Sequence, residues 1–217
     1  LFVPVVVNVG VIGMFDEQER TSASLTTVTL SMVFVGLLAA INLANQFGFD
    51  GSAYAANLVA GVTGREELRA RIFAYSTYVA PLLVVITLTV GALLGRPQWV
   101  PAMLGSVIAA YGSALAIVLF VSVFGAYALP ETSNPFAINT AGGTAKSLLS
   151  LVVLVVAGVA AIPIVAGAFL LGSGWLWIGL PVGAAYGVGA ALLGAYLAGD
   201  VLDRRMPELL ATVTPRR

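Results

Sequence analysis

The sequence predicts an all-α fold, that of a polytopic helical membrane protein, and two observations carry this prediction. First, 59% of the 217 residues are hydrophobic and only 9% are charged, whereas a soluble domain carries roughly 25% charged residues. Second, charge-free segments long enough to cross a bilayer as a helix, about 20 residues each, follow one another along the chain. The alternation of polar and apolar residues that is typical of a transmembrane barrel strand does not occur.

We expect five complete transmembrane helices and one partial helix, in a single transmembrane domain. The partial span covers residues 1–14 and would be about 21 Å long as a helix, against a hydrocarbon core of roughly 30 Å. Because the chain begins inside this apolar run, we interpret the sequence as a piece, or the ordered part, of a longer protein. The complete spans are expected at residues 24–46, 72–95, 101–129, 147–170 and 175–198, and a charged tail follows at residues 199–217.

The basic residues predict which loops face the cytoplasm, since short cytoplasmic loops are enriched in lysine and arginine. Only Arg20 and Arg96 fall on one side of the alternating spans. The other side therefore faces the cytoplasm, and it holds residues 47–71, residues 130–146 and the C-terminus. We expect the protein in the inner or plasma membrane. The basic residues on the cytoplasmic side are Arg65, Arg69, Arg71, Lys146, Arg204, Arg205, Arg216 and Arg217.

Composition excludes several classes of function. The chain has no cysteine and no histidine, which removes disulfides, thiolate nucleophiles, haem ligation and histidine metal sites. We therefore expect no catalytic residue, no metal site and no cofactor bound by this chain. Ten basic and ten acidic residues leave no net charge, so nucleic acid is not an expected partner. The stretch AGGTAKS at residues 141–147 lacks the glycine before Lys146 that a nucleotide-binding P-loop requires.

The expected spans contain no Asp, Glu, Lys, Arg or His. Ion-coupled carriers usually place such groups at membrane depth, so this absence argues against a self-sufficient carrier, although unwound backbone carbonyls can bind sodium. Asn42 and Asn45 are polar and lie near the inner end of the 24–46 span. They either line a substrate entrance or form hydrogen bonds between helices, and the second interpretation is favoured.

A stripe of small residues recurs every four positions in the last span. Small residues allow helix backbones to approach closely in lipid. Tight packing within this chain is the favoured interpretation, and a seam between subunits is the alternative. The stripe consists of Gly183, Gly187, Ala191, Ala195 and Gly199.

The segment at residues 50–62 predicts a short amphipathic helix between two spans. Asp50 can cap it, Tyr54 and Leu58 lie on its apolar face, and Gly61 and Gly64 end it. Thr63 then begins a capping box with Glu66, and Glu67 and Arg71 are spaced as an i,i+4 ion pair on the next helix. The segment either lies on the inner leaflet or docks a cytoplasmic partner. The second interpretation is favoured, because membrane-surface helices usually carry several basic residues.

The stretch NQFGFDGSAYAANLVAGVTGREELRARIFAY at residues 45–75 resembles the permease of a type-2 ABC exporter, in the actinobacterial branch of multidrug or antibiotic exporters. The NPF at residues 134–136 and the C-terminal RRMPELLATV support the resemblance. In that family a short cytoplasmic coupling helix follows the second span of each six-helix unit. The resemblance implies that this chain is the C-terminal six-helix half of a double-length permease, or else a half-transporter.

The resemblance also implies a function and partners. The chain would be a transport subunit that moves a drug-like, antibiotic or lipid-like amphipathic solute out of the cell by alternating access. A separate cytoplasmic ATP-binding subunit dimer would bind ATP and Mg, and a second six-helix unit would complete the pathway. The coupling interface would comprise Phe47, Phe49, Asp50, Tyr54, Asn57 and Leu58. The alternatives are an ion-coupled carrier or channel, and a membrane scaffold without transport activity.

Overall fold

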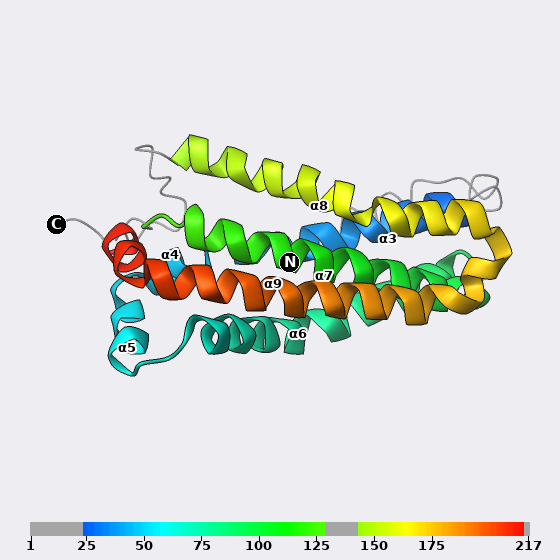
Figure 1. Cartoon of the computed structure of the whole chain (residues 1–217). Coiled ribbons are helices and arrows are strands. Elements are labelled where there is room, and N and C mark those ends of the chain that lie inside the picture. Colours follow the sequence, from blue (N-terminus) through cyan, green and yellow to red (C-terminus); the bar gives the residue numbers. More distant parts are fainter. Residues whose placement is uncertain (1–23, 129–142, 215–217) are drawn as a thin grey trace.

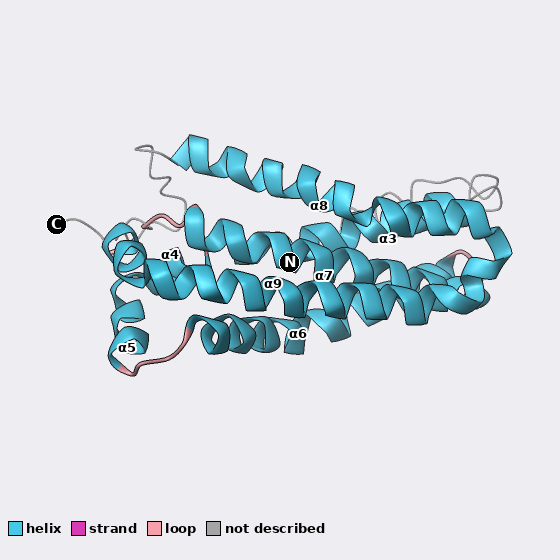
Figure 2. Cartoon of the chain, viewed as in Figure 1, coloured by secondary structure: helices cyan, strands magenta, loops and turns pink. Residues whose placement is uncertain are grey.

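The computed structural model describes residues 24–128 and 143–214, with side chains from residue 151 onward in the second range. Every regular element in these ranges is helical, which confirms the all-α prediction for this part of the chain. The long helices lie side by side in an elongated bundle (Figure 1). Short loops join most of the helices (Figure 2).

The helices are as follows, with short 3-10 turns denoted η. They are α3 (Leu25–Ala40), η1 (Ile41–Leu43), α4 (Gln46–Asp50), η2 (Gly51–Ala53), α5 (Tyr54–Val59), α6 (Gly64–Leu93), η3 (Pro97–Trp99), α7 (Val100–Phe124), α8 (Gly143–Leu171), η4 (Gly172–Gly174) and α9 (Trp175–Val213).

Four helical stretches in the described ranges are long and apolar enough to cross a membrane. They are Leu25–Val59, Gly64–Leu93, Pro97–Phe124 and Leu151–Val213. The last stretch contains most of α8 and all of α9, joined by η4. The structure thus gives four candidate stretches and does not reproduce the expected count of five complete spans and one partial one. The partial span at residues 1–14 and the loop at 130–146 lie outside the described residues.

Two helices continue beyond the apolar spans that the sequence predicts. α6 begins at Gly64, eight residues before the expected span, because the capping box of Thr63 and Glu66 forms as predicted. α9 likewise continues past residue 198, the expected end of the last span, to Val213 and is 39 residues long. A helix of that length extends about 58 Å, well beyond the hydrocarbon core.

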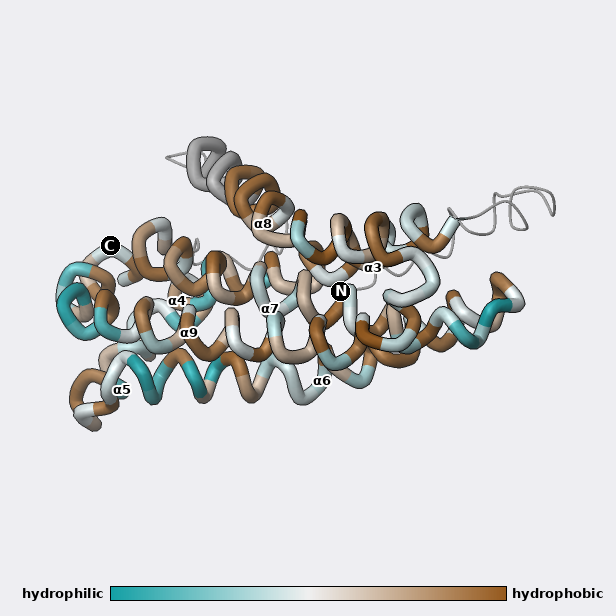
Figure 3. Tube along the Cα trace, turned by 45° about the vertical axis from the view of Figure 1, so that its right-hand side comes forward, coloured by the Kyte–Doolittle hydropathy of each residue, from teal (hydrophilic) through white to brown (hydrophobic). Residues whose placement is uncertain are grey.

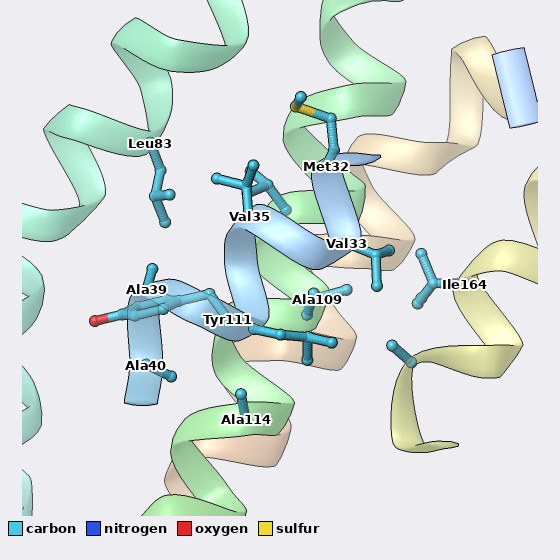
Figure 4. Packing of buried hydrophobic residues seen from close by; sticks show 14 of the residues in the cluster. Met32, Val33, Val35, Ala39, Ala40, Leu83, Ala109, Tyr111, Ala114 and Ile164 are labelled. Carbon is cyan, nitrogen blue, oxygen red and sulfur yellow. The ribbon is translucent and has the colours of Figure 1, made fainter. Parts of the chain in front are cut away.

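α7 is the central helix of the bundle, and side chains from several helices pack on it. In Figure 4, Met32 and Val33 of α3 and Ile164 of α8 lie around Ala109 and Ala114 of α7. These side chains are almost completely buried. The main core of the bundle is therefore apolar and follows the length of α7.

The outer surfaces of the bundle are also apolar. α6, α8 and α9 expose large apolar side chains along their length, among them Val85, Val155, Phe169, Trp177 and Leu193. Figure 3 shows hydrophobic residues along the helices and hydrophilic residues gathered near the ends. Soluble monomers rarely expose apolar surface so widely, so these helices indicate a membrane protein.

Candidate functional site

Charged side chains gather at one end of the bundle. Among the charged residues whose side chains the structure describes, Arg96 lies at the opposite end, and the others lie at residues 50–71 and 200–208. Figure 3 shows this hydrophilic end beside α5 and the end of α9. The predicted loop at 47–71 and the end of α9 therefore share one end of the molecule.

The segment between α3 and α6 is a bent chain of short helices and not the single helix expected at residues 50–62. α4, η2 and α5 follow one another, and Gly51 makes the bend with a φ of 54°. The Asp50 side chain makes no capping hydrogen bond, so the expected cap is wrong. Gly61, with a φ of 69°, follows α5 as predicted. Gly64 begins α6 and does not end this segment. We call residues 46–59 the docking segment.

Phe47 and Tyr54 point into the chain itself. Both are at most 1% exposed, and their rings meet edge to face with centroids 5.1 Å apart. This corrects the expectation that these two residues offer an apolar face to a partner, because the end of α9 and the start of α6 already cover them. Leu58 packs partly against the same cluster.

The outer side of the docking segment carries two large apolar side chains. Phe49 is 72% exposed and Val59 is 89% exposed. The residues between them on the exposed side are small, namely Ser52, Ala53 and Ala56. The Asn57 amide instead turns toward α6 and donates hydrogen bonds of 3.0 and 2.9 Å to the two carboxylate oxygens of Glu67.

Arg71 connects the docking segment to α6. Its Nε donates to Oε1 of Glu67 over 2.6 Å, which confirms the predicted i,i+4 pair. Its Nη2 also donates to the Asp50 carboxylate at the end of α4. The guanidinium lies 4.5 Å from the centre of the Phe47 ring, within the range of a cation–π interaction.

A second set of contacts joins the start of α6 to α9, outside the apolar stretch 175–198. Arg65 pairs with Asp200 over 2.6 Å, and the backbone N–H of Gly64 donates to Oδ1 of Asp203 over 2.5 Å. The hydrogen bond from Arg65 holds the pKa of the Asp200 carboxyl below its usual range. Hydrogen bonds from Thr63 lower the pKa of Glu66 in the same way.

The small-residue stripe of α9 lies in an interface within the chain. Each of its members is buried. A Cβ atom added at Gly183 would lie 2.1 Å from the carbonyl oxygen of Gly105, and one at Gly187 would lie 2.2 Å from that of Ile108. A Cβ atom added at Gly199 would lie 2.7 Å from Cα of Arg65 in α6. This geometry matches the favoured interpretation, tight packing within this chain.

Asn42 and Asn45 both form hydrogen bonds to neighbouring elements. The amide of Asn42 donates to the Tyr75 hydroxyl over 3.2 Å, and that hydroxyl donates to the carbonyl of Ala39 over 2.5 Å. Asn45 donates to the backbone carbonyl of Tyr127 and accepts from its N–H. These bonds support the favoured interpretation of hydrogen bonding between elements at the point where α3 ends.

Sequence reasoning missed the partners that lie far away along the chain. The contact of Asp50 with Arg71 and that of Gly64 with Asp203 span 21 and 139 residues, and no local pattern signals them. An indirect signal was present at the end of α9, where Leu202, Leu209 and Val213 continue a helical spacing. Within the described ranges, no group of three or more acidic side chains could hold a metal ion.

Comparison of the chain with protein-family models, with curated proteins and with solved structures found no match.

Proposed function

We propose that this chain is the transmembrane permease subunit of an ATP-driven type-2 ABC exporter, with its C-terminus in the cytoplasm. The observation that carries this proposal is the pair of exposed side chains Phe49 and Val59 on the docking segment. They lie at the charged end of the bundle, on the segment that the Asp50–Arg71 ion pair joins to α6. We infer that another protein covers this part of the surface.

The partner that suits this surface is a cytoplasmic ATP-binding subunit, present as a dimer, that holds ATP and Mg. Phe49 and Val59 would enter an apolar groove on it, while the small residues between them allow close approach. Differential contact with the two states of that dimer is what would shift the permease between inward- and outward-open forms. Five spans, the partial span at residues 1–14 and a second six-helix unit would complete a pathway for an amphipathic solute.

A helix lying on the membrane surface explains the docking segment less well. Such helices usually carry basic residues on their polar face, and no Lys or Arg occurs at residues 46–59. In addition, the side of the segment that carries Phe47 and Tyr54 is buried within the chain, so it is not free to enter lipid. Among the large apolar side chains of this segment, only Phe49 and Val59 are exposed.

Copurification tests the proposal. The tagged chain is expressed with its candidate ATP-binding protein, purified in mild detergent, and the eluate is assayed for that protein and for ATP hydrolysis. We expect Phe49→Ala to reduce the recovered ATPase strongly, because an aromatic anchor at an interface centre is often worth 2 kcal/mol or more, about 30-fold in affinity. Val59→Ala should reduce it less, since valine is seldom such an anchor. Phe73→Ala is the matched control, since Phe73 is equally exposed on α6.

Unchanged recovery with both docking variants would overturn the proposal, and absence of any ATPase would favour an ion-coupled carrier or a scaffold.

A further inference from the structure

The end of α9 and the docking segment meet in a small apolar core, to which Leu68 of α6 and Leu119 and Val123 of α7 also contribute. Phe47 and Tyr54 of the segment meet Leu202, Leu209 and Val213 of α9, and each is at most 3% exposed. Pro207 lies inside this part of α9, and Figure 1 shows the last turns of the helix, in red, turned beside α4. Proline removes a helix hydrogen bond and bends a helix. The bend thus places the last turns over the docking segment.

Arg71 holds the same segment from the other side. Its side chain is only 18% exposed and contacts carboxylates of α4 and α6 at once. Glu67, which Arg71 binds, also accepts both hydrogen bonds from Asn57 of α5. One guanidinium and one carboxylate therefore tie both short helices of the segment to α6.

The connection to α3, by contrast, is interrupted. The α-helical hydrogen bonding of α3 ends at Ala40, a 3-10 turn follows, and Asn45 has a φ of −126° and a ψ of 37°. Such 3-10 turns are frequent where an α-helix ends, and this one interrupts the regular hydrogen bonding between α3 and the docking segment. The docking segment is thus joined to α3 by a broken helix, to α6 by the Asp50–Arg71 ion pair, and to α6, α7 and α9 by a packed core.

We propose that Arg71 is a positioning residue which, with the last turns of α9, holds the docking segment as one rigid unit with α6 and α9. A displacement of Phe49 and Val59 is then passed to α6 and α9 and not along α3. The consequence for transport rests on the proposed function. The rigidity of the unit does not, because it is a property of the chain without a partner and is measured on the purified chain.

The reaction rate of a single introduced thiol shows whether the end of α9 stays packed against the docking segment. The chain has no native cysteine, so that thiol is the only one that reacts. The reporter is Val213→Cys, a change of similar size at a position that is 0% exposed. In the purified chain we expect its thiol to react at least tenfold more slowly than that of Phe49→Cys. Adding Arg71→Gln should raise the Val213→Cys rate at least tenfold. Arg71→Lys should restore protection only in part, since an ammonium lacks the planar fork that serves two carboxylates.

Two controls keep the result specific. Arg69→Gln removes an exposed arginine of the same helix that makes no salt bridge in the described part of the chain, and it should leave Val213→Cys protected. Ser106→Cys, buried in α7, should stay protected in the Arg71→Gln background. If Arg71→Gln also exposes Ser106→Cys, Arg71 supports the whole bundle and the proposal is wrong. It is equally wrong if Arg71→Gln leaves Val213→Cys protected.

A distance measurement separates positioning from general stability. Spin labels at Val59→Cys and Gln98→Cys mark the docking segment and the opposite end of the bundle. We expect Arg71→Gln to broaden their distance distribution, and Arg69→Gln to leave its width unchanged. An unchanged width with Arg71→Gln would contradict the proposal. These results do not depend on a partner, so normal rigidity together with failed ATPase copurification would overturn only the proposed function.

Discussion

Arg65 of α6 and Asp200 of α9 form a two-pronged ion pair, with Nε–Oδ1 and Nη2–Oδ2 distances of 2.6 and 2.9 Å. The guanidinium also lies 3.8 Å from the centre of the Tyr196 ring. Nearby, Asp203 accepts from the first backbone N–H of α6, where the helix dipole favours negative charge. Two carboxylates of α9 thus bind the start of α6. They hold the two helices together at the point where Gly199, which has no side chain, allows a close approach.

The pH dependence of this pair is the first prediction. The pKa of Asp200 lies below its ordinary value of 3.8, so its stabilising effect is present above that pH and is lost as pH falls through the lowered pKa. We expect the difference in thermal midpoint between the wild type and Asp200→Asn to be constant from pH 8 to about 5 and to shrink below about 3.8. The two midpoints are measured across that range in the same detergent. If the difference between the two midpoints already declines between pH 7 and 5, the stabilisation does not come from ionised Asp200.

The second prediction concerns the contact between α7 and α9. Gly187→Ala places a Cβ atom 2.2 Å from the carbonyl oxygen of Ile108, so the helices must move apart. Overpacking of this kind costs about 1–3 kcal/mol, and we expect a lower thermal midpoint and a lower yield of monodisperse protein. Gly189→Ala is the matched control two residues away, where an added Cβ meets nothing within 4 Å. Equal midpoints for the two variants would show that α7 and α9 do not pack closely.

Local features of this fold were predictable, and distant contacts were not. The capping box at Thr63 and the Glu67–Arg71 pair follow from residues three and four positions apart, and both are present. The stripe of α9 was recognised by its spacing, but its neighbours in α7 required the structure. The outward face of the docking segment was assigned wrongly for Tyr54. Hydrophobic periodicity shows which side of a helix is apolar and cannot show that the end of α9 covers it.

The orientation in the membrane gives the third prediction. Val59 ends α5 and Gln98 lies in η3 between α6 and α7, and both are exposed. α5 and the turn between α6 and α7 lie at opposite ends of the bundle (Figure 1), and the basic residues predict that residue 59 is cytoplasmic. In intact cells, a membrane-impermeant thiol reagent should label Gln98→Cys and not Val59→Cys. After the cells are opened, both should react, which shows that Val59→Cys is accessible. Labelling of Val59→Cys alone in intact cells would reverse the orientation and remove the proposed site from the cytoplasm.

The last prediction separates the buried face of the docking segment from its outward face. The Tyr54 hydroxyl is buried and has no hydrogen-bond partner among the described residues, and such a group costs about 1–3 kcal/mol. We therefore expect Tyr54→Phe to keep or raise the thermal midpoint, with ATPase copurification unchanged, because the ring is buried and does not face the proposed partner.

Tyr54→Ala should lower the midpoint instead, since loss of a buried aromatic ring costs about 3–5 kcal/mol. The matched control is Tyr78→Ala, whose ring is 52% exposed and whose loss should matter much less. The midpoints come from thermal unfolding followed by size-exclusion chromatography. A Tyr54→Ala variant that stays as stable as Tyr78→Ala but loses the ATPase would place Tyr54 in the docking surface. The proposed partner would then bind a conformation in which Tyr54 is not buried between α4, α5 and α9.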